Sequence, residues 1–139
     1  MPIYLRTALA LIIGVVAGGA VNMAIILAGP HMIPPPAGVD MTTAEGLQAS
    51  MHLLSPRHFV MPFLAHALGT FAGALIGALI AAAHRTFVAY AVGVFFLCGG
   101  IAASFMIPAP AWFIALDLRV AYVPMAWLAL LVSKHARRP

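Results

Sequence analysis

Charge is scarce in this chain. Three acidic residues and seven lysines and arginines occur among 139 residues, so 7% of the chain is charged while 64% is apolar. Soluble domains carry about 25% charged residues, so the composition excludes an ordinary soluble domain and predicts the lipid bilayer as the main partner. The net charge of +4 is spread over segment ends. It therefore lacks the contiguous basic face that nucleic-acid binding needs.

Cysteine is nearly absent. Because Cys98 is the only one, the chain can form neither an internal disulfide nor a zinc site built on several thiolates. A metal site of imidazole and carboxylate ligands is chemically allowed, and its weak candidates are Glu45, His52 and His58. Their spacing matches no metal-binding motif. Metal binding therefore stays open, and no cofactor is expected.

Long polar stretches are also missing, and four apolar runs fill most of the chain. Each run is close to the ~20 residues that an α-helix needs to cross a bilayer. The predicted spans cover residues 7–28, 62–83, 87–106 and 111–132. We therefore predict a single membrane domain over residues 1–139 with an all-α fold, an integral membrane four-helix bundle.

Residues 29–56 are too long for a simple turn between two spans. Three consecutive prolines at 34–36 make a stiff, extended start. Thr42 followed by Glu45 matches a capping box. Apolar residues then recur at helical spacing, which predicts a short amphipathic helix between the first two spans, lying on the membrane surface.

Lysine and arginine are distributed unequally between the two predicted faces of the membrane. Five fall on one face, at Arg6, Arg85, Lys134, Arg137 and Arg138, and two on the other, at Arg57 and Arg119. Since positive residues collect on the cytoplasmic side, both termini are predicted in the cytoplasm. Residues 29–56 are then periplasmic, and the protein belongs to a bacterial inner membrane.

Glycine recurs at four-residue spacing in two spans. Gly69, Gly73 and Gly77 share one face of the second predicted span, and Gly14 and Gly18 share a face of the first. Small residues at this spacing allow two helices to approach closely in a membrane. We expect these faces to pack against other helices, including those of further copies in a homo-oligomer.

Few polar side chains interrupt the spans, and most lie at a similar depth. The outer third of each predicted span contains one, and these are Asn22, His66, Ser104 and Asp117. Polar groups inside a bilayer seek partners within the protein. Some of these four should therefore meet, and Tyr122 can join them from the next turn. Together they are the candidate ligand or ion pathway.

Three functional hypotheses follow, and no residue is assigned as catalytic. The favoured one is an oligomeric transporter or channel that moves a small solute or ion through the outer polar layer. The second is a structural or accessory membrane protein. The third is a membrane-embedded hydrolase that uses His66 and Asp117 with Ser104, or that depends on a metal.

Three stretches resemble a set of uncharacterised four-span bacterial inner-membrane proteins. They are PPPAGVD at 34–40, HLLSPRHFVMPFLAHALGT at 52–70 and MIPAPAWFIALDL at 106–118. The resemblance implies a four-span fold and an inner-membrane location. It implies no activity and no site, because that set has no assigned activity.

Overall fold

The computed structural model describes residues 1–136, and all regular structure in that range is helical. The α-helices are α1 (Ile3–Met32), α2 (Ala44–Ser50), α3 (Val60–Ile80), α4 (Arg85–Met106), α5 (Ala111–Val120) and α6 (Val123–His135). Two 3₁₀ turns, η1 (Met51–Leu53) and η2 (Pro56–Phe59), join α2 to α3. The all-α prediction is therefore confirmed. Arg137 and Arg138, counted above as cytoplasmic charges, lie outside the described residues.

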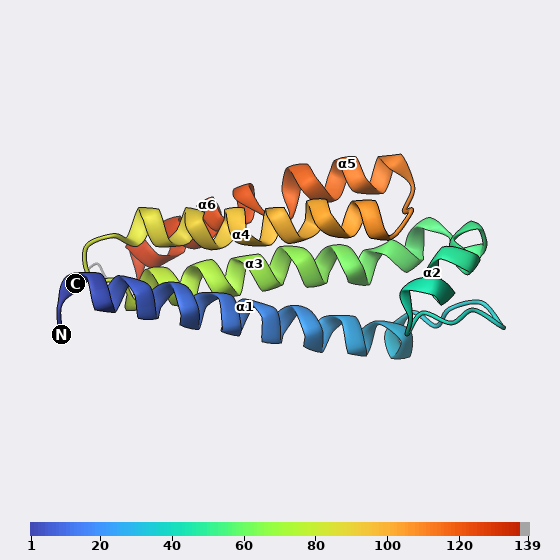
Figure 1. The fold of residues 1–139 in the computed structure, drawn as a ribbon, viewed down its shortest axis with the longest axis horizontal. Coiled ribbons are helices and arrows are strands. Elements are labelled where there is room, and N and C mark those ends of the chain that lie inside the picture. Colours follow the sequence, from blue (N-terminus) through green and yellow to red (C-terminus); the bar gives the residue numbers. More distant parts are fainter. Residues whose placement is uncertain (137–139) are drawn as a thin grey trace.

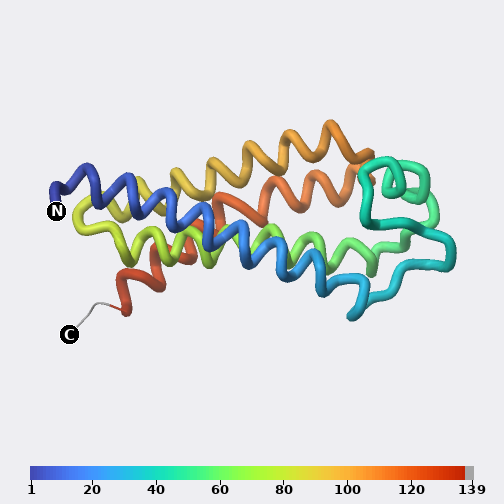
Figure 2. The backbone as a smooth tube through the Cα atoms, turned by 60° about the horizontal axis from the view of Figure 1, so that its bottom comes forward, coloured from blue at the N-terminus to red at the C-terminus, as the bar shows by residue number. Residues whose placement is uncertain are grey.

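Four helical stretches are long and apolar enough to cross a membrane. They are Ile3–Met32, Pro56–Ile80, Arg85–Met106 and Ala111–His135, the last combining α5 and α6. The helices run side by side along one axis, with α3 between α1 on one side and α4 and α6 on the other (Figure 1). The start of α1 and the end of α6 lie at one end of the molecule and the connection through α2 at the other (Figure 2).

The closest helix contact joins α1 to α3 through glycine. A Cβ atom added to Gly18 would lie 2.6 Å from the Gly69 carbonyl oxygen, and one added to Gly73 would lie 2.6 Å from the Gly14 carbonyl oxygen. Gly77 also faces α1, near the Ala10 carbonyl oxygen. Neither backbone leaves room for a side chain. The glycine faces expected to serve a homo-oligomer are thus occupied within one chain.

Side chains near the N-terminus of α1 form polar contacts with the connection between α3 and α4. The Arg6 Nε–H donates to the Ile80 carbonyl oxygen over 2.7 Å, and Thr7 Oγ1 lies 3.0 Å from His84 Nδ1. The last carbonyls of a helix have no partner within it, so Arg6 satisfies one at the end of α3. The α3 helix ends at Ile80, three residues before residue 83, where the second predicted span ends.

The fourth predicted span is not a continuous helix. Proline removes one helical hydrogen bond, and its ring clashes with the carbonyl four residues earlier. For Pro124 that carbonyl belongs to Val120, where α5 ends, and Pro124 lies in the first turn of α6. The stretch predicted as the fourth span, 111–132, falls within Ala111–His135, which is long and apolar enough to cross a membrane and is broken into two helices before this proline.

The cap of α2 also differs from the prediction. Thr43, not Thr42, is the N-cap residue, and its hydroxyl oxygen accepts a hydrogen bond from the Gly46 N–H over 3.0 Å. Thr42 instead donates its N–H and its hydroxyl to the Asp40 carboxylate. These bonds hold the pKa of Asp40 below its ordinary value of 3.8. The proposed Thr42–Glu45 capping box was wrong, because the chain turns one residue later.

Candidate functional site

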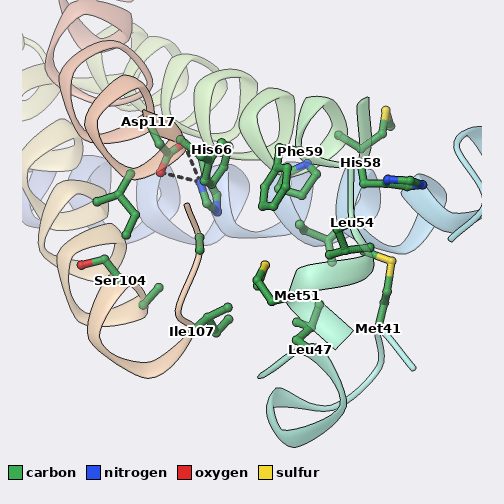
Figure 3. Close-up of a pocket in the computed structure, with 18 of the residues that line it drawn as sticks. Met41, Leu47, Met51, Leu54, His58, Phe59, His66, Ser104, Ile107 and Asp117 are labelled. Carbon is green, nitrogen blue, oxygen red and sulfur yellow. Dashed lines mark hydrogen bonds and ion pairs between the residues drawn. The ribbon is translucent and has the colours of Figure 1, made fainter. Parts of the chain in front are cut away.

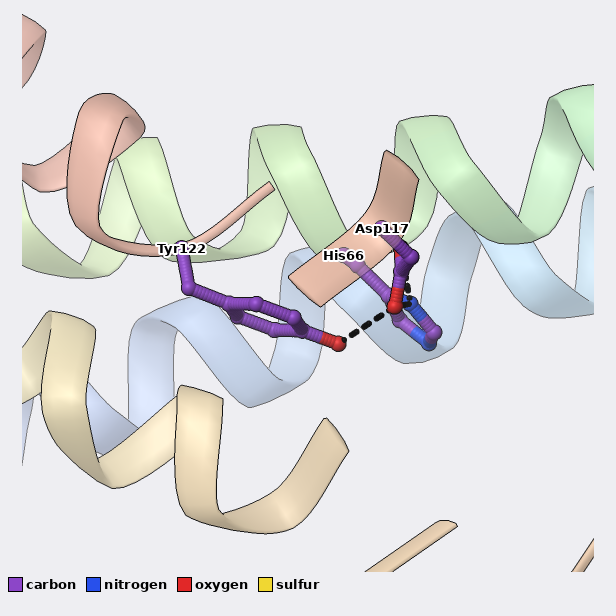
Figure 4. Close-up of polar contacts among 3 residues, drawn as sticks. All are labelled: His66, Asp117 and Tyr122. Carbon is purple, nitrogen blue, oxygen red and sulfur yellow. Dashed lines mark hydrogen bonds and ion pairs between the residues drawn. The ribbon is translucent and has the colours of Figure 1, made fainter. Parts of the chain in front are cut away.

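His66 and Asp117 meet across the interface between α3 and α5. The His66 Nδ1 atom lies 2.9 Å from both carboxylate oxygens of Asp117 (Figure 4). Asp117 is 4% exposed, whereas the His66 side chain is 25% exposed. A carboxylate accepts hydrogen bonds and an N–H donates them, so this contact places the ring proton on Nδ1. The Nε2 atom has no hydrogen-bond partner among residues 1–136.

Tyr122 completes the cluster from the break between α5 and α6. Its hydroxyl donates to Asp117 over 2.9 Å, and its ring stacks on His66 with the ring centres 5.8 Å apart (Figure 4). In a continuous helix, residues five apart point about 140° away from each other. The break before Pro124 turns Tyr122 back toward Asp117. Gly100 makes room, because a Cβ there would overlap the Tyr122 hydroxyl.

An outer cavity of about 210 Å³ lies between this cluster and the segment that connects α1 to α3. On one side its lining is apolar and comes from that segment, through Met41, Leu47, Met51 and Leu54. His66 and Asp117 line the opposite side (Figure 3). An apolar cavity of ~150 Å³ already accepts benzene. The outer cavity therefore has room for part of an apolar molecule.

The connecting segment is fixed to α4 by one polar contact and is held together internally by others. Gln48 Nε2 donates to the Met106 carbonyl oxygen over 2.6 Å, which fastens α2 to the end of α4. His58 is buried, its Nδ1 accepts from the Ser55 N–H over 3.0 Å, and its Nε2 lies 3.2 Å from the Pro34 carbonyl oxygen. The apolar face of α2 and η1 is thus held over the outer cavity.

A second, inner cavity of about 210 Å³ lies deeper along α3, toward the chain ends. It shares His66, Gly100 and Ala103 with the outer cavity. Thr70, one turn beyond His66, is 0% exposed, and its hydroxyl has no hydrogen-bond partner within the described chain. A buried polar group without a partner costs free energy. This hydroxyl therefore marks a place where a polar ligand or water would be stabilised.

Asn22 and Ser104, the other two predicted site residues, take different positions. Asn22 lines the inner cavity, and its side chain makes no hydrogen bond within residues 1–136. Ser104 lines the outer cavity, but its hydroxyl donates to the Ile101 carbonyl oxygen over 2.7 Å within α4. Both belong to the walls of the site. Neither contacts the carboxylate of Asp117 through a hydrogen bond.

The metal candidates do not converge. Among residues 1–136 no group of three histidine, cysteine, aspartate or glutamate side chains could hold a metal ion. Glu45 and His52 are exposed, and both nitrogens of His58 are engaged with the connecting segment. Thr70 was not predicted as a site residue. The signal for it was its position four residues after His66, on the same face of α3.

Comparisons of the chain with protein-family models, curated proteins and solved structures find no match. Function is therefore inferred from this site alone. The site offers one ring nitrogen without a partner, a buried carboxylate that orients the ring, and two adjoining cavities. A histidine oriented in this way can accept a proton at its other nitrogen.

Proposed function

We propose that this protein is a multi-pass protein of the bacterial inner membrane, with its four apolar stretches packed as a bundle and both termini in the cytoplasm. Its hydropathy supports membrane insertion. The charge distribution supports the orientation, because Arg6, Arg85 and Lys134 lie toward the end that holds the termini. The segment with α2 then faces the periplasm.

Within the membrane, the protein binds an amphiphile in the outer cavity and accepts a hydrogen bond from its polar head at Nε2 of His66. One observation carries this function: buried Asp117 holds Nδ1 of His66, while Nε2 has no partner among residues 1–136 and the ring lines a largely apolar cavity. A tail fits against methionine and leucine side chains. The head meets an acid–base group oriented by a carboxylate.

This arrangement favours binding over conduction by a single chain. Beyond Thr70, toward the chain ends, α3, α4 and α6 meet through a core of buried apolar residues that includes Ala74, Val92 and Ala126. Within residues 1–136, the buried side chains of that core are all apolar. Association of several copies stays a prediction, and it must use a surface other than the α1–α3 glycine contact.

The hydrolase hypothesis has weaker support. A nucleophilic hydroxyl must hydrogen-bond to its base, whereas the Ser104 hydroxyl donates to a backbone carbonyl of its own helix. The cluster therefore supplies a base that is oriented but has no nucleophile bonded to it. Accepting a hydrogen bond from a ligand requires only the groups that are present.

Filling the cavity tests the proposal. A photoactivatable decanol should label the purified protein saturably, on peptides that line the outer cavity. Ala103→Phe inserts a ring into the wall shared by both cavities, so saturable labelling should fall about tenfold or more, a loss of at least ~1.4 kcal/mol of binding free energy.

The matched control is Ala102→Phe, at the neighbouring position, which is exposed and lines neither cavity. It should label like the wild type. Labelling that never saturates, or equal labelling of the two variants, would contradict amphiphile binding in this cavity.

A further inference from the structure

We infer that the ligand is an uncharged amphiphile with a hydroxyl head, bound with its head directed inward at His66 and Thr70 and its tail toward α2. This inference rests on the proposed function and names the chemical class that the site takes. It depends on three features of the two cavities: where their unsatisfied polar atoms lie, which charges line them, and whether those atoms accept or donate.

The free polar atoms lie at the deep end of the combined cavity. Near the connecting segment, both ring nitrogens of His58 are engaged, and the Ser104 hydroxyl is bonded within α4. The unpartnered groups are Nε2 of His66, the Thr70 hydroxyl and the Asn22 side chain. Thr70 lies about 15 Å along α3 from its first residue. A head group that reaches Thr70 lies deep among the apolar spans. The ligand is then oriented opposite to a lipid of the outer leaflet, whose head group faces the periplasm.

The charges around the cavities exclude an ionic head. No lysine or arginine of residues 1–136 lines either cavity, and these are the side chains that bind phosphate and carboxylate. The one acidic side chain, Asp117, already accepts from His66 and Tyr122. A cationic head would therefore compete with bonds already made. An anionic head would lie beside a carboxylate without a compensating cation.

The hydrogen-bonding roles select a hydroxyl. With its proton on Nδ1, the neutral His66 ring can only accept at Nε2, so the ligand must donate. Thr70 lies four residues further along α3, on the same helix face, and its hydroxyl can donate to the same ligand oxygen. One ligand hydroxyl satisfies both groups. An ether or ester oxygen cannot donate to Nε2.

Competition among compounds with the same chain tests the head group. Excess 1-decanol should displace the photoactivatable decanol at a concentration about tenfold lower than decyl methyl ether, decyl phosphate or decyltrimethylammonium. Thr70→Val keeps the side-chain shape and removes the hydroxyl, so it should reduce the preference for decanol over the ether severalfold. Thr70→Ser should restore the preference.

Ser133→Ala is the matched control, because the Ser133 hydroxyl is already bonded to the Leu130 carbonyl oxygen within α6 and the residue lines neither cavity. It should leave the preference unchanged. Equal displacement by decanol and the ether, or stronger displacement by the phosphate or the ammonium compound, overturns the head-group inference and leaves amphiphile binding standing. Absence of saturable labelling in the wild type overturns both.

Discussion

Replacement of Asp117 by leucine should destabilise the protein by about 3 kcal/mol, because two donors lose their acceptor in a buried position. The carboxylate is 4% exposed and accepts from both the His66 ring and the Tyr122 hydroxyl. Leucine has a similar size, so little of the loss comes from a cavity. The free energy of unfolding in lipid bicelles measures it.

Two further variants separate the hydrogen bonds from the charge. Asp117→Asn keeps one oxygen acceptor and should lose about 1 kcal/mol, while the preference for decanol disappears because the amide N–H can donate to Nδ1 and leave the ring proton on Nε2, which then cannot accept from decanol. Glu45→Gln changes an exposed carboxylate and should alter stability by less than ~0.5 kcal/mol. A leucine variant as stable as the Glu45 variant would show that Asp117 is not bonded as described.

Replacement of Gly18 by alanine should cost about 1–3 kcal/mol, the usual cost of overpacking a tight contact. The new methyl group would meet the Gly69 carbonyl oxygen at 2.6 Å and the Phe96 ring at 2.8 Å. A backbone carbonyl cannot move aside, so α1 must separate from α3. The free energy of unfolding in bicelles again measures the effect.

The adjacent glycine is the matched control. A Cβ on Gly19 meets nothing within 4 Å, and alanine is a better helix former than glycine. Gly19→Ala should therefore be neutral or more stable by up to ~1 kcal/mol. Equal changes in the stability of the two variants would contradict a close α1–α3 contact at Gly18.

The contact between His66 and Asp117 follows a simple expectation from the sequence. Few polar side chains interrupt the apolar runs, and residues at one depth in separate spans have few alternative partners. Tyr122 was named only as a side chain that could join them. The position of Tyr122 depends on the break before Pro124. The clash between that proline ring and the Val120 carbonyl can be expected from the sequence. The length required of a membrane span nevertheless favoured one continuous helix.

Other features depend on tertiary packing that sequence patterns do not contain. The glycine spacing predicts that some helix comes close to α1 and α3, but the same spacing fits a neighbour in another copy. Adjacent threonines are equivalent cap candidates until the backbone angles select Thr43. The outer cavity exists because the connecting segment folds over the helices, and residues 29–56 show only a short amphipathic pattern.

The nitrogen-15 NMR spectrum of His66 in lipid bilayers, assigned by its loss in His66→Asn, tests the site most directly. At a pH where the ring is neutral, we predict a proton on Nδ1 and none on Nε2, since Nδ1 donates to Asp117. Added 1-decanol should shift the Nε2 resonance and leave Nδ1 protonated. A proton on Nε2, or an Nε2 resonance that decanol does not move, would contradict a histidine held by Asp117 and open to a ligand.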